Sequence, residues 1–280
     1  MKKLSNGLIK DFTTYKLSGK MKDVYCPSSV NELKELLESN MKYKILGNGS
    51  NLIISESYDG VFIKLNEFND IIFNKNEVKV GCGYVLSKLS LECARKGLSG
   101  LEFACGIPGS VGGAIYMNAG AYGSNISDVL KSVTVLDDSL NIKILDASEL
   151  NFEYRNSLFK NDNYIILDGT FVLRKKKSDL ILKDINEIME SRRRKQPLEY
   201  PSAGSVFRNL EGYSAGRLVQ KANLQGEHVG DAYVSEKHAN FIVNKGHASA
   251  EDVIKLIDIV KNKVKKEYNV DLSLEQEIIR

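Results

Sequence analysis

The chain has 280 residues, a formal net charge of +3 and 27% charged residues, which is the composition of an ordinary globular protein. This weak charge balance argues against a dedicated nucleic-acid-binding protein, and no apolar stretch approaches the roughly 20 residues that a membrane helix needs. The first residues, MKKLSNGLIKDF, contain lysines but no apolar run, so we expect no secretory signal and a cytoplasmic protein with reduced cysteines.

Four segments have the periodic apolar residues of amphipathic helices. They cover residues 28–39, 84–97, 178–197 and 249–270. Ser28 and Ser29 are suitable N-caps for the first helix, and Gly97 is a natural stop for the second. The third ends in a cationic run before Pro197, which suits the helix dipole.

Short apolar strands are predicted between these helices. Their ranges are 43–47, 60–65, 77–83, 132–137, 163–174, 240–244 and 274–279. Because strands outnumber helices and the two are mixed along the chain, we predict an α+β protein. The charged zone around residues 174–200 is the best candidate for a domain boundary.

Two glycine-containing stretches stand out: KILGNGSNLIIS at residues 44–55, and GIPGSVGGAIYMNAGAYG at residues 106–123. Both lie next to apolar strands. Glycines there allow positive φ angles and let backbone N–H groups reach a ligand, where successive N–H groups form an anion nest. Such a large neutral cradle suits a diphosphate-linked cofactor better than a bare phosphate, which would favour lysine or arginine.

Neither glycine stretch matches the dinucleotide-binding fingerprint or the P-loop motif. In GNGSNL, Leu52 replaces the third glycine of a dinucleotide-binding fingerprint and a strand follows instead of a helix, while neither stretch ends in the GK[ST] of a P-loop. For GNGS alone, a simple tight turn remains an alternative. We interpret the basic runs at 174–177 and 192–195 as solvated ends of elements rather than an anion site.

The four cysteines show no metal-ligand spacing, so we predict no metal site. We interpret them as small apolar residues, with a catalytic thiol as an alternative.

The segments LGNGSNLIIS and GLEFACGIPGSVGGAIYMNAGAYG together resemble the two FAD-binding loops of the UDP-N-acetylenolpyruvoylglucosamine reductases. FEYRNSLFK, AGSVFRN and LEQEII match the same family in the same order, so the resemblance covers essentially the whole chain. It implies a two-lobed FAD-binding domain of the vanillyl-alcohol-oxidase type over residues 1–180. A smaller α+β substrate-binding domain would follow over residues 181–280, with a last strand that could pack back on the FAD-binding domain. About 48 residues separate Arg155 from AGS, so the chain resembles the shorter form of the family, which lacks an inserted tyrosine loop.

The same resemblance implies non-covalent FAD, NADPH as co-substrate and the enolpyruvyl ether of UDP-N-acetylglucosamine as substrate. The product would be UDP-N-acetylmuramate for the bacterial cell wall. The expected FAD-binding residues are Gly47, Asn48, Gly49, Ser50, Asn51, Leu52, Gly106, Ile107, Gly109, Ser110, Gly112, Gly113, Asn118, Ala119 and Gly120.

By the resemblance, Arg155, Ser205 and Glu275 occupy the three catalytic positions of the family. The reaction suits these residue types, because negative charge builds on the substrate carboxylate and an arginine is the natural stabiliser. Ser205 is a suitable proton donor only to a very basic carbanion. Taken singly, a surface arginine, a turn serine and a solvent-facing carboxylate are alternatives.

Three residues are candidates for binding the substrate: Arg208, Asn209 and Arg217. Asn209 matches a family substrate position, whereas the two arginines follow from their charge and their proximity to Ser205. A helix-surface role for Arg217 is an alternative. We expect neither nucleic acid nor a membrane as a partner. An oxidase of the same superfamily and a non-catalytic UDP-sugar-binding protein remain rival functions.

Overall fold

The computed structural model describes residues 1–210 and 212–280, and the chain forms two compact units. The first unit comprises Met1–Lys3, Tyr25–Asn48 and Phe62–Ser191, and the second comprises Leu4–Val24, Gly49–Val61 and Arg192–Arg280. Both units contain helices and strands, so the predicted α+β class is confirmed. The units take alternate pieces of the N-terminal part of the chain, and the functional division near residue 180 stays a prediction.

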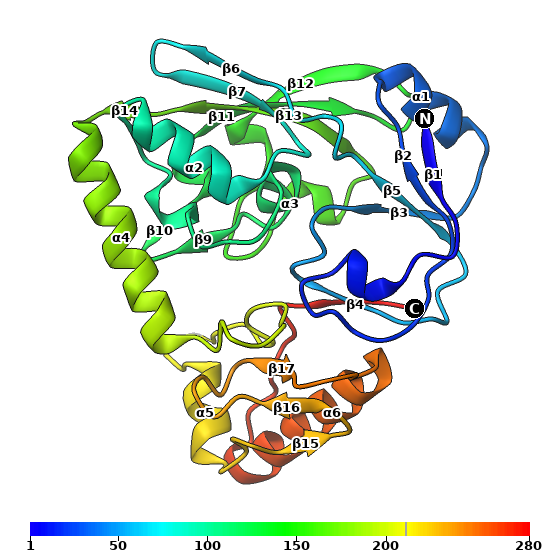
Figure 1. The fold of residues 1–280 in the computed structure, drawn as a ribbon, viewed down its shortest axis with the longest axis vertical. Helices are drawn as coiled ribbons and strands as arrows, with labels where there is room; N and C mark the ends of the chain where they lie inside the picture. The colour runs from blue at the N-terminus through cyan, green and yellow to red at the C-terminus, as the bar shows by residue number, and fades with distance from the viewer. Residues whose placement is uncertain (211) are drawn as a thin grey trace. The chain divides into compact units, whose positions relative to one another are not determined.

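The first unit is built on a five-stranded antiparallel sheet in the order β12-β11-β13-β7-β6 (Figure 1). Its strands are β6 (Ile71–Asn74), β7 (Glu77–Gly81), β11 (Leu130–Leu136), β12 (Ile142–Asp146) and β13 (Ile165–Val172). Three of them, β7, β11 and β13, confirm predicted strands. The edge strands β6 and β12 were not predicted.

Helices α2 (Leu86–Arg95) and α3 (Val111–Tyr116) belong to the same unit and share its main apolar core with the sheet. On α2, Leu86, Leu89 and Cys93 are buried in this core, as the predicted apolar face requires. Gly97 follows with a φ of +70°, so the predicted stop is confirmed.

A second sheet, most of whose residues belong to the first unit, has the order β1-β2-β5-β3. Its strands are β1 (Lys2–Leu4), β2 (Val24–Cys26), β3 (Tyr43–Leu46) and β5 (Val61–Lys64). Helix α1 (Val30–Glu38) buries Leu33 and Leu36, and Ser29 caps it by accepting from the Glu32 N–H at 3.3 Å. The first unit also contains the short strands β8 (Leu98–Ser99), β9 (Gly120–Ala121), β10 (Ser124–Asn125) and β14 (Arg174–Lys175), and most of helix α4 (Ser178–Lys195). Helix α4 confirms the third predicted helix.

The second unit contains a three-stranded antiparallel sheet of β15 (His228–Val229), β16 (Ala232–Val234) and β17 (Ile242–Asn244). Helix α6 (Ala250–Tyr268) packs on this sheet through the predicted stripe, and the shorter α5 (Ala215–Lys221) packs on α6. Strand β18 (Glu277–Ile279) pairs in parallel with β4 (Leu52–Ile54), which brings the end of the chain to the first glycine stretch. No helix of the described residues is both long enough and apolar enough to span a bilayer.

Candidate functional site

The first glycine turn, residues 47–51, is shaped by close contacts of the chain with itself. Gly49 has a φ of +61°, and a Cβ on it would lie 2.2 Å from the backbone oxygen of Phe12. A Cβ on Gly47 would lie 2.7 Å from Oγ of Ser110. Asn48 donates Nδ2 to the carbonyl of Pro108 at 3.2 Å. In the first unit, the start of this turn therefore lies against the second glycine stretch, as two loops of one cofactor site should.

The second glycine stretch, residues 106–123, is more than an extended turn, because it contains α3. Ser110 caps this helix by accepting from the Gly113 N–H at 3.2 Å. A Cβ on Gly112 would lie 2.8 Å from Cβ of Cys82, and one on Gly120 would lie 2.7 Å from the backbone oxygen of Ser124. We expected these glycines to give a ligand access to the backbone, and the structure adds that packing alone already requires several of them.

Two consecutive backbone N–H groups in each stretch have no hydrogen-bond partner among the described residues. Within residues 1–210 and 212–280, no hydrogen bond uses the N–H of Gly49, Ser50, Gly109 or Ser110. All of these residues except Ser50 are buried, and buried N–H groups without partners are rare in proteins. Pairs of consecutive N–H groups suit phosphate oxygens. The residues present therefore fit a cofactor that carries phosphates.

Arg155 lies beside the end of the second glycine stretch, in the first unit. Its φ of +55° is in the left-handed region, which non-glycine residues seldom adopt and which is often found at functional sites. Its Nη2 donates to the carbonyl of Gly120 at 2.8 Å, and its guanidinium lies 5.0 Å from the ring centroid of Tyr154. Asn118 donates Nδ2 to the carbonyl of Glu153 at 3.0 Å. These contacts fix the arginine next to two of the predicted FAD-binding residues.

Ser205 and Glu275 come together in the second unit through backbone pairing. The N–H of Glu275 donates to the carbonyl of Val206 at 2.8 Å. Ser205 also forms an isolated antiparallel backbone bridge with Phe241. Asn51 of the first glycine turn donates Nδ2 to the carbonyl of Glu275 at 3.0 Å. Three predicted site residues that are far apart in the sequence, Asn51, Ser205 and Glu275, thus belong to one compact body. Their convergence with Arg155 stays a prediction.

Comparisons with known proteins identify the family of this chain. A family model described as an FAD binding domain matches residues 22–142, and one described as the UDP-N-acetylenolpyruvoylglucosamine reductase C-terminal domain matches residues 196–279. The UDP-N-acetylenolpyruvoylglucosamine reductase of Clostridium novyi is 43% identical over 98% of this chain and 91% of its own length. That of Caldicellulosiruptor saccharolyticus is 43% identical over 97% of this chain and 90% of its own. The chain belongs to the UDP-N-acetylenolpyruvoylglucosamine reductase family.

A solved reductase of this family has the same fold. The crystal structure of UDP-N-acetylenolpyruvylglucosamine reductase from Thermus caldophilus is 36% identical, covers 100% of this chain and 98% of its own, and superposes with a TM-score of 0.86. The predicted resemblance and the predicted fold, an FAD-binding domain followed by a C-terminal domain, are therefore confirmed. The chain is an oxidoreductase with an FAD-binding domain.

In this member of the reductase family, a second glutamate, Glu277, pairs with Asn51 through its backbone and was not predicted. Glu277 begins β18, and its N–H donates to the carbonyl of Asn51 at 2.9 Å. Glu275 and Glu277 are both partly exposed, whereas Gln276 between them is only 3% exposed. The alternation of charged and buried residues in LEQEII could have indicated both carboxylates and the buried amide.

The three substrate-binding candidates lie on neighbouring elements of the second unit. Arg208 donates its N–H to the carbonyl of Ser273 at 2.9 Å, which places it beside the segment that leads to Glu275. Asn209 accepts the Ala215 N–H at 3.1 Å on its Oδ1 and so holds the start of α5, the helix that carries the exposed Arg217. Their contact with substrate stays a prediction.

The cysteines behave as core residues. All four are buried, and among the described residues none of them is in a disulfide. Burial raises the pKa of both Cys82 and Cys93 to about 12, so these thiols are protonated near neutral pH and are poor nucleophiles. Among the described residues, no group of three or more His, Cys, Asp or Glu side chains could hold a metal ion.

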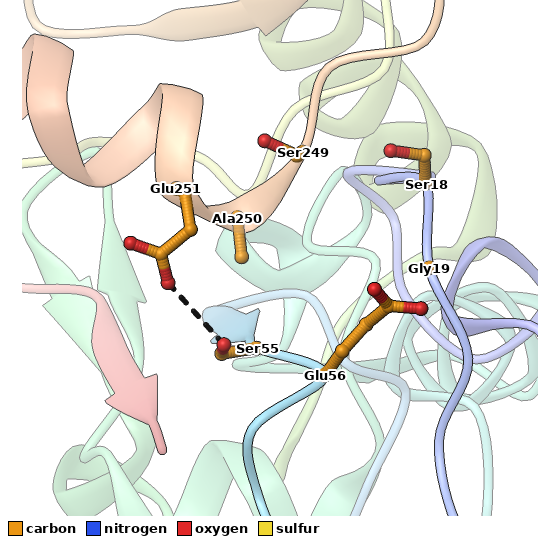
Figure 2. A pocket seen from close by; sticks show the side chains of 7 residues that line it. All are labelled: Ser18, Gly19, Ser55, Glu56, Ser249, Ala250 and Glu251. Carbon is orange, nitrogen blue, oxygen red and sulfur yellow. Dashed lines mark hydrogen bonds between the residues drawn. The ribbon is translucent and has the colours of Figure 1, made fainter.

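A hollow of about 280 Å³ in the second unit contains none of the predicted site residues (Figure 2). It is lined by Ser18, Gly19, Ser55, Glu56, Ser249, Ala250 and Glu251, and Ser55 Oγ donates to Glu251 at 3.3 Å. Two carboxylates at its wall would repel the phosphates of a nucleotide. We therefore give it no part in the candidate site.

Proposed function

We propose that this chain reduces the enolpyruvyl ether of UDP-N-acetylglucosamine to UDP-N-acetylmuramate with NADPH, a cytoplasmic step of peptidoglycan synthesis. FAD, bound non-covalently, would supply the hydride, with NADPH as the source of the reducing electrons. Relatives with this reductase name are 43% identical over nearly the whole chain. The observation that carries the proposal is the backbone contact of Glu275 with both Val206 and Asn51, which joins two predicted catalytic segments to a cofactor turn.

The chain's own groups suit the phosphates of the cofactor. The N–H pairs of Gly49 and Ser50, and of Gly109 and Ser110, would each donate hydrogen bonds to phosphate oxygens. The three histidines all follow residue 227, so none can form a covalent link within the glycine stretches. We propose residues 1–180 as the FAD-binding domain and residues 181–280 as the substrate-binding domain.

Arg155 stabilises the charge that develops during the reaction. The reduction adds a hydride to the β-carbon of the enolpyruvyl group and then a proton to its α-carbon. After the hydride is added and before the proton arrives, negative charge is delocalised onto the substrate carboxylate. A guanidinium is permanently charged and grips two oxygens at once. Losing one such electrostatic donor typically costs about 3–4 kcal/mol of transition-state stabilisation. Glu275 helps to polarise the carboxylate.

Ser205 supplies the proton. Its hydroxyl is a weak acid, but the carbanion at the α-carbon is basic enough to take its proton, and a relay to solvent then restores the hydroxyl. The side chain is partly exposed, which allows that exchange. Arg208, Asn209 and Arg217 are proposed to hold the uridine diphosphate through charge-assisted and amide hydrogen bonds.

A visible spectrum recorded without oxygen tests the proposal. The FAD-reconstituted protein should be yellow, should be bleached by NADPH, and should regain its colour on adding the enolpyruvyl substrate, with UDP-N-acetylmuramate detected by mass spectrometry. Ser205→Ala should still be bleached but should regain its colour much more slowly. A protein that stays colourless with FAD, or that is bleached by a sugar or alcohol instead of NADPH, contradicts the proposal.

A further inference from the structure

We propose that Gln276 is a positioning residue that fixes the peptide groups leading into Ser205. This inference rests on the proposed function, because it concerns the serine that we propose as proton donor. The Gln276 side chain is buried, and its Nε2 donates to the carbonyls of both Ala203 and Gly204, each at 3.2 Å. One side-chain amide thus holds the two carbonyls immediately before the serine.

The planarity of the peptide bond carries this anchor to Ser205. The carbonyl of Gly204 and the N–H of Ser205 belong to one planar group, so holding the oxygen also sets the direction of the Ser205 Cα. Gly204 has a φ of +75°, and a Cβ built on it would meet no atom within 4 Å. No side chain at Gly204 could pack to fix this turn, whereas the Gln276 amide holds its carbonyl directly.

The peptide group on the other side of Ser205 has a separate anchor. The N–H of Val206 donates to the carbonyl of Asn240 at 2.8 Å. The Asn240 side chain accepts the Phe207 N–H at 3.0 Å and donates to the Phe207 carbonyl at 2.8 Å. The serine is therefore held from both sides, and Gln276 provides the anchor on its N-terminal side.

The surroundings of Gln276 explain why an amide is needed at this position. Ala203 is only 2% exposed, so an apolar replacement would leave buried carbonyls without a donor. A carboxylate could not donate to them, and it would bury a charge.

The test compares two buried amides in the FAD-loaded enzyme. Gln276→Met removes the anchor at nearly constant volume. Asn244→Leu is the control, because Asn244 is equally buried and also donates to two consecutive carbonyls, of Tyr15 at 3.2 Å and Lys16 at 3.0 Å. Its Oδ1 accepts the Gly246 and Ala248 N–H groups as well, so this variant removes more hydrogen bonds than Gln276→Met does. Stopped-flow absorbance without oxygen separates bleaching by NADPH from recolouring by the enolpyruvyl substrate. Gln276→Met should slow recolouring about 10- to 100-fold and change bleaching by less than about twofold. Asn244→Leu should leave both rates within about twofold of the wild type, because it does not touch the serine segment.

A double-mutant cycle separates positioning from general damage. If Gln276 acts through Ser205, Gln276→Met should slow recolouring no further in a Ser205→Ala background. Equal slowing of both half-reactions, or the same loss with and without Ser205, overturns the inference. Should the methionine variant not fold, Gln276→Asn keeps the amide but shortens its reach, and a wild-type recolouring rate in that variant also overturns it. A wild-type enzyme that the substrate does not recolour overturns the proposed function itself.

Discussion

Replacing Gly49 with alanine tests whether the first glycine turn is shaped by the chain or by its ligand. A residue with a Cβ at a φ of +61° costs about 1–2 kcal/mol. The Cβ would also lie 2.2 Å from the oxygen of Phe12 and 2.8 Å from Cα of Thr13, both of which are backbone atoms that cannot turn aside. We therefore expect Gly49→Ala to reduce the free energy of unfolding by about 3 kcal/mol or more.

Gly226→Ala is the matched control in the same unit. Gly226 has a φ of +82°, but the nearest atom to its Cβ would be Oε1 of Glu236 at 3.7 Å, an ordinary contact. Only the conformational cost remains, about 1–2 kcal/mol. At about 2–4 °C per kcal/mol, the unfolding temperature of the FAD-free protein, followed by circular dichroism, should fall by about 2–8 °C for Gly226→Ala and by about 6–12 °C or more for Gly49→Ala. Equal shifts for the two variants, or an effect of Gly49→Ala on FAD affinity alone, would refute the packing argument.

Three further predictions concern charge. Arg155→Lys keeps the charge but loses the fork that reaches the Gly120 carbonyl, so kcat should fall about 100-fold with FAD content unchanged in the purified protein, and a wild-type kcat would contradict the proposed role. Glu275→Gln should lower kcat about tenfold or more while Glu277→Gln leaves it within about twofold, and the opposite pattern would transfer the role to Glu277. Burial lowers the pKa of His238, so the unfolded chain binds the histidine proton more tightly than the folded chain does. The unfolding temperature should therefore decline as the pH falls below about 6.5, and it should decline less in His238→Gln. An equally steep decline in that variant would rule out His238 as the cause.

The long amphipathic elements could be predicted from the sequence because local signals and tertiary packing agree there. Helix α6 begins one residue after its cap, Ser249, and buries the expected stripe. The edge strands β6 and β12 could not be predicted, since Ile72 and Ile144 are 62% and 71% exposed and the polar–apolar alternation does not mark a buried face. Helix α3 contains Gly112 and Gly113, which are poor helix formers, so it depends on packing and on its cap.

The residues of the candidate site could also be predicted only in part. The glycine stretches stood out by their composition, and the family resemblance predicted the roles of Arg155 and Ser205. Gln276 could not be found by that route, because its partners Ala203 and Gly204 are 73 and 72 residues away and nothing local indicates a shared hydrogen bond. The role of the buried Gln276 amide can be seen only in the structure, where the last segment of the chain is paired with the segment that contains Ser205.

The pairing of β4 with β18 makes the first glycine turn and the segment that carries Glu275 and Glu277 dependent on each other. Each strand has only three residues, and a ladder that short specifies its register weakly. Asn51 reinforces it, since its side chain donates to the carbonyl of Glu275 while its own carbonyl accepts the N–H of Glu277. Burial of Gln276 also fixes the register of this pairing, because a shift of β18 by one residue would bury the carboxylate of Glu275 or Glu277 in place of the amide. A variant that loosens the turn at Asn51 must therefore also move the carboxylates, so its effect on kcat reports on both.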